Sequence, residues 1–411
     1  MVSHLFIEGV LLDGQRTNVI VTDNIITGIG SELPMPVGST YIDGSQYAAF
    51  PSFANMHTHA PMTLLRGLGD DTPLDEWLNK WIWPTEKRLN PDSIYWGTRL
   101  ACLEMIKSGT TAFNDMYFFL PEMAKAVSDS GIRAQLGLNL FGDGDELDLF
   151  NPEPYPNVTY SIAPHAIYTV TKRGLTRAAE YCCLHGLAYH IHMAETLKEV
   201  SDCQSQHGCR PYELLDRIGV LDTMGEKLIG AHSLHLSEHE IELIGRHGCT
   251  VVHNPNSNLK LGSGYRFLFS ELADSGANVT IGTDGCASSN NLDMLEAAKT
   301  AALLQKGWRQ SPTASPARDI MQAATENGFR ALGLKAGRIA EGWLADMILV
   351  DLDNVAFVPC HNALSNLVYS AHSDAIDTVI CNGKIVMRHR QVAGEVEIVA
   401  NARKYAKDLV G

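Results

Sequence analysis

The chain has no C-x-x-C motif, and its nine cysteines are scattered between Cys102 and Cys381. An odd, dispersed set of cysteines in a chain of 411 residues is not the pattern of a disulfide framework. Disulfides are rare under the reducing conditions of the cytoplasm. The cysteine pattern therefore indicates a reduced, cytoplasmic protein.

Basic residues are also few, because 32 lysines and arginines stand against 47 acidic residues, for a formal net charge of −15. A nucleic-acid-binding surface needs a basic face, so this balance argues against such a partner. No uninterrupted apolar stretch approaches the roughly 18 residues that a membrane span needs. The amino terminus lacks the basic segment of a signal peptide and reaches Glu8 and Asp13 early. We expect a soluble protein without a nucleic acid or a membrane as partner.

The chain does contain short apolar segments that alternate with helical stretches. Residues 92–109 and 172–186 have apolar residues at three-to-four spacing and end in glycine, which is typical of helices. Eight β/α units over about 250 residues predict an α/β fold of the (β/α)₈ type, a TIM-like barrel, with a doubly wound sheet as the alternative. The third connection, residues 141–157, is too short and proline-rich for a full helix. The eight predicted strands lie within residues 48–57, 110–117, 133–140, 158–165, 187–195, 227–233, 249–255 and 278–285.

Both ends of the chain have the composition of antiparallel strands. Turn signals at Asp13-Gly14 and Asp23-Asn24 separate apolar runs near the amino terminus. Asn382-Gly383, a strong two-residue turn signal, predicts a hairpin near the carboxyl terminus. We therefore predict a composite β-sandwich domain from residues 1–50 and 341–411, and a catalytic barrel over residues 51–340.

Polar residues recur at the carboxyl ends of the predicted strands, where barrels carry their chemistry. Uncorrelated surface histidines would not select the same end of so many strands. His57 and His59 lie two residues apart on one strand, so both point to the same face and into the barrel mouth. The strand-end residues are His57, His59, His165, His190, His192, His232, His253, Asn254 and Asp284.

A metal ion accounts for this pattern. Catalytic zinc takes nitrogen and oxygen ligands and keeps one position for water. An H-x-H pair alone is equally compatible with a structural or hydrogen-bonding role. His57 and His59 together with a later strand-terminal histidine and Asp284 predict a metal centre. Three imidazoles and a carboxylate suit Zn²⁺, although iron(II) or manganese ions accept similar ligands.

Five motifs occur in order along the chain: "MHTH", "HIHMAET", "GAHSLHL", "HNPNSNLKLGSG" and "GTDGCASSNNLDM". This series resembles the amidohydrolase superfamily, in particular the methylthioadenosine/S-adenosylhomocysteine deaminases and related aminohydrolases. The resemblance spans nearly the whole chain. It implies one divalent metal ion per subunit, bound by His57, His59, His192 and Asp284, and a homo-oligomer.

Two strands leave a choice between histidines. His190 and His192 share a face, so spacing alone allows either as the ligand. The family pattern places the ligand three residues before a glutamate, which selects His192 and Glu195 and leaves His190 as a hydrogen-bonded core residue. The same resemblance selects His232 as catalytic and leaves His235 on a helix or at the surface.

The resemblance also assigns roles. Asp284 is a ligand and accepts the proton of the attacking water, His232 holds that water, and Glu195 shuttles a proton to a ring nitrogen of the substrate. Trp77, Glu86, His165, Glu195 and Ser288 match substrate-side positions. Each has a plainer alternative: Glu86 as a solvated helix carboxylate, and Ser288 and Asn254 as caps or ties of loops. For Trp81 and Trp83 we expect core packing.

These roles predict a hydrolase of the carbon–nitrogen bond of a cyclic amidine, releasing ammonia from methylthioadenosine, adenosine or S-adenosylhomocysteine. The loop after the third strand, residues 141–157, has five acidic residues and no arginine. A carboxylate clamp needs a guanidinium, so a substrate without a carboxylate tail fits better unless Arg66 or a partner subunit supplies one. Alternatives are an aminohydrolase of guanine, a pterin or a triazine, and a non-catalytic metal-binding homologue. The H-x-E and P-C-x-x-C pattern of cytidine deaminases is absent, which excludes that type of site.

Overall fold

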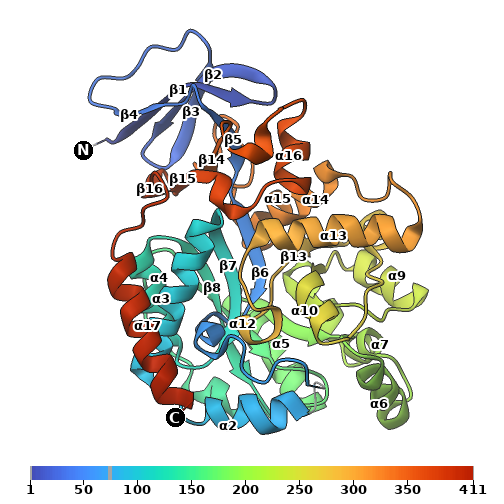
Figure 1. Ribbon diagram of the computed structural model, residues 1–411. Helices are drawn as coiled ribbons and strands as arrows, with labels where there is room; N and C mark the ends of the chain where they lie inside the picture. Colours follow the sequence, from blue (N-terminus) through green and yellow to red (C-terminus); the bar gives the residue numbers. More distant parts are fainter. Residues whose placement is uncertain (1, 73–75, 411) are drawn as a thin grey trace.

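The computed structural model describes residues 2–72 and 76–410. Eight parallel strands form a nearly closed barrel in which each strand pairs with the next along the chain (Figure 1). Each overlaps one predicted segment, so the TIM-like barrel is confirmed and the doubly wound order is excluded. The strands are β6 (Phe53–Thr58), β7 (Thr110–Tyr117), β8 (Arg133–Leu140), β9 (Val158–Pro164), β10 (Ala188–Met193), β11 (Leu228–His232), β12 (Thr250–His253) and β13 (Asn278–Ile281).

The two end strands of this sheet, β13 and β6, meet where the barrel nearly closes. Every residue of these two strands is buried, as expected when one face fills the barrel and the other is covered by helices. Beyond β13, the Thr283 N–H donates to Asn55 Oδ1 at 3.0 Å, and the Asp284 N–H donates to the His57 carbonyl at 2.9 Å. These bonds hold Asp284 against the end of the strand that carries the H-x-H pair.

Helices surround the barrel. The predicted helices are present as α3 (Pro91–Lys107) and α5 (Lys172–His185), and the connection from β8 to β9 contains only the short 3₁₀ segment η3 (Asp145–Leu149), as expected. No helix within the described ranges is long and apolar enough to cross a membrane. The other segments up to residue 331 are η1 (Ala60–Leu65), η2 (Trp77–Ile82), α2 (Trp83–Glu86), α4 (Leu120–Ser130), α6 (Leu197–His207), α7 (Pro211–Arg217), α8 (Val220–Met224), η4 (Gly225–Lys227), α9 (Glu238–Arg246), α10 (Pro255–Lys260), α11 (Phe269–Ser275), α12 (Cys286–Ser289), α13 (Met294–Arg309), α14 (Ala317–Ala324) and α15 (Glu326–Ala331).

A second sheet combines strands from both ends of the chain, as predicted. Its order is β16-β15-β14-β5-β1-β2-β3, with β4 paired to β1. Asn382 and Gly383 have φ values of 53° and 75°, which is the left-handed geometry of a tight hairpin turn between β15 and β16. The strands are β1 (His4–Leu12), β2 (Gln15–Thr22), β3 (Ile25–Gly30), β4 (Thr40–Asp43), β5 (Tyr47–Pro51), β14 (Met347–Asp351), β15 (Ile376–Cys381) and β16 (Lys384–Met387).

The two sheets adjoin at Ser52, which separates β5 from β6. The buried Arg133 of β8 forms an ion pair with Asp346, just before β14, and so links the barrel to the second sheet. The carboxyl-terminal helix α17 (Glu395–Val410), red in Figure 1, lies along α3 of the barrel instead of joining the sheet. The division at residues 50 and 341 therefore stays a prediction. Between β14 and α17 lie η5 (Val355–Phe357), α16 (Ala363–Tyr369) and η6 (Ser373–Ala375).

Candidate active site

A cavity of about 570 Å³ opens at the carboxyl ends of the barrel strands. This volume is in the range of small-molecule sites. Nearly all the predicted site residues border it or lie directly behind it. The lining includes His59, Trp77, Glu86, His165, His192, Glu195, His232, Asp284 and Ser288, with Met62, Leu78, Ile82, Trp83, Lys87, Leu89, Tyr117, Phe118, Phe119, Asn139, Phe141, Tyr168 and Leu261.

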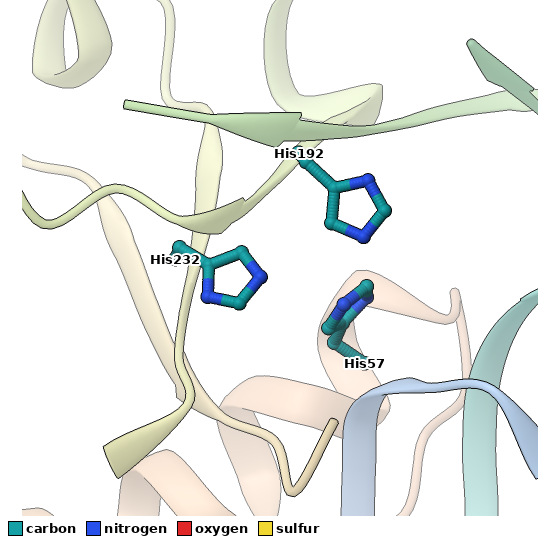
Figure 2. Close-up of side chains that lie close together, drawn as sticks. All are labelled: His57, His192 and His232. Atoms are coloured by element: carbon teal, nitrogen blue, oxygen red, sulfur yellow. The ribbon is translucent and has the colours of Figure 1, made fainter. Parts of the chain in front are cut away.

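The predicted metal ligands converge at the floor of this cavity. His59 Nε2 lies 3.3 Å from Asp284 Oδ1 and 3.4 Å from His192 Nε2. His57 Nε2 lies 3.5 Å from the same Asp284 oxygen. Figure 2 shows the rings of His57, His192 and His232 turned toward one another from different strands. Two overlapping groups have ligand atoms close enough to share one ion: His57, His59 and Asp284, and His57, His192 and His232.

Hydrogen bonds from the backbone set the tautomers of two of these histidines. His59 Nδ1 lies 2.8 Å from the Met116 carbonyl, and His192 Nδ1 lies 2.7 Å from the His165 carbonyl. A carbonyl only accepts, so each Nδ1 carries a hydrogen and each Nε2 is the ring nitrogen that faces the centre, where it can bind a metal ion once it carries no proton. Such partners are what orient metal-binding imidazoles in general.

The charges and hydrogen bonds of the centre suit a bound cation. Burial alone lowers the pKa of His59, but the hydrogen bond and the charge of Asp284 outweigh it and raise that pKa to about 9. Burial raises the pKa of Asp284, but the two histidines hold it well below its usual range. His57 Nε2 is buried and has no hydrogen-bond partner among the described residues. Three imidazole nitrogens and one carboxylate, with this nitrogen unsatisfied, fit a divalent metal ion.

Three residues of the site adopt a strained backbone. Ala194, His232 and Asp284 follow or end strands with positive φ values of 49°, 68° and 67°. For residues other than glycine this conformation costs about 1–3 kcal/mol and persists where the surroundings impose it. The strain turns the side chains of His232 and Asp284 at the strand ends toward one centre.

The two predicted catalytic residues outside the ligand set, Glu195 and His232, are adjacent. His232 Nε2 lies 3.9 Å from Glu195 Oε2, and the hydroxyl of Ser263 donates to Glu195 Oε1 at 3.2 Å. The buried carboxylate of Glu199 accepts from the backbone N–H groups of Ala194 and Glu195, both at 2.8 Å. This pair of bonds fixes the turn from which Glu195 reaches the cavity.

The unselected histidines occupy different places. His190 is fully buried, with Nε2 3.0 Å from His57 Nδ1 and Nδ1 3.1 Å from the amide nitrogen of Asn114, consistent with a hydrogen-bonded core residue. The expectation that His235 lies on a helix or at the surface is wrong. His235 is half-buried in a loop, where its Nε2–H donates to the Ser263 carbonyl at 2.7 Å.

The residues predicted to contact the substrate line the upper cavity, which is the part of the cavity above the metal ligands at its floor. Trp77 is buried and its indole N–H donates to the Leu68 carbonyl at 3.1 Å. Ser288 is buried and its hydroxyl donates to the Gly285 carbonyl at 3.1 Å, so it also ties its own turn. The expectation of core packing for Trp81 and Trp83 is wrong: they are 42% and 43% exposed, and Trp83 borders the cavity.

Sequence reasoning missed several lining residues. The hydroxyl of Tyr117 donates to Glu86 Oε1 at 2.6 Å and so holds the carboxylate that was assigned to substrate. Tyr117 ends β7, and strand-end position was the signal that could have identified it. The ring of Phe141 stacks between Phe118 and His165, at centroid distances of 6.4 and 5.2 Å. His165 was predicted, but Phe118 and Phe141 have no simple sequence signal, because they lie in separate loops after different strands.

Comparison with known proteins now decides the family. Residues 48–386 match the Amidohydrolase family. The chain belongs to this family. Its curated relatives include a 5′-deoxyadenosine deaminase of Methanospirillum hungatei, which is 46% identical over 382 residues, or 90% of this chain and 84% of that protein. A 5-methylthioadenosine/S-adenosylhomocysteine deaminase of Archaeoglobus fulgidus is 46% identical over 384 residues, or 90% of each chain.

A solved structure has the same architecture throughout. It is the crystal structure of an adenosine deaminase from Xanthomonas campestris with bound zinc. The TM-score is 0.92 and the sequence identity is 34%, with coverage of 99% of this chain and 98% of that one. The resemblance inferred from the five motifs is confirmed, as is the barrel with a second sheet from both termini.

Proposed function

We propose that this amidohydrolase is a metal-dependent hydrolytic deaminase of adenine nucleosides. The observation that carries the proposal is the meeting of four ligand residues with Glu195 and His232 at the floor of one cavity. A structural metal site needs neither Glu195 nor His232. The three relatives described above are named as deaminases of adenine nucleosides, which supports the same chemistry.

We assign the metal to His57, His59, His192 and Asp284, with Zn²⁺ as the ion. The zinc in the structure from Xanthomonas campestris supports this choice of ion. When bound, a divalent metal acts as a Lewis acid that lowers the pKa of a water molecule at the site. His232 is close enough to act as a ligand as well, but a further protein ligand would fill the position that the water needs.

The chain's own residues then handle the protons. Asp284 is oriented by the Ser257 hydroxyl, which donates to Oδ2 at 2.6 Å, and by the Gly285 N–H, which donates to Oδ1 at 2.7 Å. We assign to Asp284 the proton leaving the attacking water, and to His232 the positioning of that water. Glu195 delivers a proton to a ring nitrogen of the substrate, which makes the carbon bearing the amino group electrophilic. Attack by water at that carbon gives a tetrahedral centre. The amino group takes the proton held by Asp284 and leaves as ammonia, while the new hydroxyl returns a proton to Glu195 as it becomes a carbonyl.

The upper cavity fits a nucleoside whose 5′ end carries no charge. Its wall there is largely apolar, with Phe118, Phe119 and Phe141 among its members. Lys87, which is exposed, is the only lysine or arginine among the described lining residues. Arg66, considered above as a carboxylate clamp, is instead paired with Glu104 and does not border the cavity.

The acidic residues of the loop at 141–157 do not by themselves exclude a substrate with a carboxylate tail. Asp143 is paired with Arg173, and Asp145 and Asp148 are paired with Arg177, so part of the charge is neutralised. Of that loop only Phe141 lines the cavity. The discrimination therefore rests on an apolar wall and a missing guanidinium, not on repulsion by carboxylates.

Methylthioadenosine and adenosine are expected to be deaminated with roughly tenfold or higher kcat/KM than S-adenosylhomocysteine, because a carboxylate tail finds no bidentate partner. Ammonia release by the zinc-loaded protein, measured at one pH and one salt concentration, makes the comparison. The panel should include 5′-deoxyadenosine, guanine, a pterin and a triazine. Equal efficiency with S-adenosylhomocysteine would contradict the assigned 5′ end, and turnover of only the other heterocycles would overturn the proposed substrate class.

Tyr117→Phe is expected to raise KM for adenosine several-fold while leaving kcat nearly unchanged. The substitution removes the hydroxyl that orients Glu86, and we assign the second oxygen of Glu86 to the ribose hydroxyls. With 2′,3′-dideoxyadenosine, which lacks those hydroxyls, the variant and the wild type should have the same KM. An equal rise of KM for both nucleosides would show that Tyr117 shapes the cavity without acting through ribose recognition.

A further inference from the structure

Asn258 lies directly behind His232, on the side away from the cavity. It is 1% exposed and belongs to helix α10, which follows β12. Its Oδ1 atom lies 2.8 Å from His232 Nδ1. Asn258 lies in the motif "HNPNSNLKLGSG" but is not among the residues to which a role was predicted from sequence.

This contact selects one tautomer of His232. An amide oxygen only accepts, so Nδ1 of His232 carries the hydrogen and Nε2 presents its lone pair to the cavity. The amide nitrogen of Asn254 lies 3.5 Å from the same ring nitrogen and would favour the opposite tautomer. The contact with Asn258 is the shorter by 0.7 Å, being 2.8 Å against 3.5 Å, and therefore the stronger.

Helix α10 orients two catalytic residues of the site, Asp284 and His232. Ser257 donates its hydroxyl to Asp284 Oδ2 at 2.6 Å, and the next residue, Asn258, holds His232. The Asn258 N–H donates to the Asn254 carbonyl at 3.0 Å, which fixes the start of the helix against the end of β12. A single turn of helix thus sets the position of two side chains that come from β11 and from the segment after β13.

We propose that Asn258 is a positioning residue for deamination, which keeps His232 as the Nδ1–H tautomer so that Nε2 accepts a hydrogen bond from the attacking water. The proposal rests on the function proposed above. Without the amide oxygen, His232 is free to populate the other tautomer, in which Nε2–H points at the water and cannot accept. Binding of substrate involves other side chains and is left intact.

Three variants test this role. Asn258→Leu keeps a similar size but offers no acceptor, and is expected to lower kcat by about 10²-fold with KM unchanged. Asn258→Asp keeps an acceptor at the same place and is expected to recover at least about tenfold of that loss. Asn256→Ala, on the same helix, removes an amide that instead donates to Glu296 at 2.8 Å, and should match the wild type.

Two further measurements separate positioning from folding and from metal loss. Zinc content should be equal in all four proteins. A nucleoside analogue with a tetrahedral, hydroxyl-bearing carbon in place of the amino-bearing carbon mimics the transition state and should bind more weakly to Asn258→Leu in calorimetry. The reaction product should bind to both proteins equally.

Several results would overturn the proposal. These are an Asp variant as slow as the Leu variant, a loss of zinc that parallels the loss of activity, or an unchanged affinity for the analogue. Wild-type deamination in the same assay shows that the proposed function stands whatever the variants do. A wild type without activity toward any adenine nucleoside would instead remove the function on which the inference rests.

Discussion

Glu195→Gln is expected to lower kcat by at least about 10²-fold while zinc stays bound. The amide has the size and polarity of the carboxyl group, but it cannot deliver a proton to a ring nitrogen. Glu195 is not among the four residues assigned to the metal, so the substitution leaves the ligand set unchanged. The hydroxyl of Ser263, which donates to Glu195 Oε1, finds an amide oxygen in its place. Steady-state kinetics and metal analysis on the same preparation check the prediction.

The matched control is Glu180→Gln, which changes the same functional group at an exposed position of α5. It should behave as the wild type in both measurements. Nearly normal turnover by Glu195→Gln with a full complement of zinc would remove Glu195 from the mechanism. A loss of zinc in that variant would instead show that Glu195 belongs to the ligand set.

His192→Ala is expected to abolish activity, because it removes one of four ligands and leaves a cavity beside the others. The protein should contain much less than one zinc ion per chain after dialysis. His239→Ala, at an exposed position of α9, is the control and should keep its zinc. Circular dichroism of both variants distinguishes metal loss from unfolding. Zinc content and activity like those of the wild type would show that His192 is not a ligand.

Zinc affinity itself should depend on pH through His59. Because Asp284 raises the pKa of His59 to about 9 despite burial, His59 holds a proton at neutral pH in the metal-free protein. Zinc must displace that proton from Nε2, so affinity should fall by about tenfold for each unit that the pH drops below this pKa. Chelator competition at about pH 6.5 and about pH 8 measures the difference. Equal zinc affinity at the two pH values would contradict the assignment of His59 as a ligand that must lose a proton.

The centre of the site was predictable because its residues obey local rules. His57 and His59 share a face by the two-residue period of a strand. His192, His232 and Asp284 lie at strand ends, and the barrel brings all of its strand ends together. The family motifs selected His192 and His232 where spacing left a choice. Position in the sequence was therefore nearly enough to place these side chains.

The rim of the cavity was not predictable, because its side chains are placed by contacts between distant segments. Trp83 is a large apolar residue of the kind that usually packs in a core, yet it borders the cavity. Arg66 was available as a carboxylate clamp by sequence, but it pairs with Glu104, on a helix 38 residues further along the chain. The bond between Tyr117 and Glu86 likewise joins β7 to the segment that covers the cavity. None of these contacts produces a periodic pattern in the amino-acid sequence from which it could be predicted.

The second sheet has a consequence for how the protein is made. Ala49 of β5 pairs with Leu349 of β14, so the partner of β5 is synthesised only after the whole barrel. Until then one edge of β5 is unpaired, with backbone groups open to other strands. Contacts at such large sequence separation form slowly, and unpaired edges favour aggregation of incomplete chains. The amino-terminal strands therefore leave the ribosome long before the strands that complete their sheet. The barrel lies in the sequence between the two halves of that second sheet.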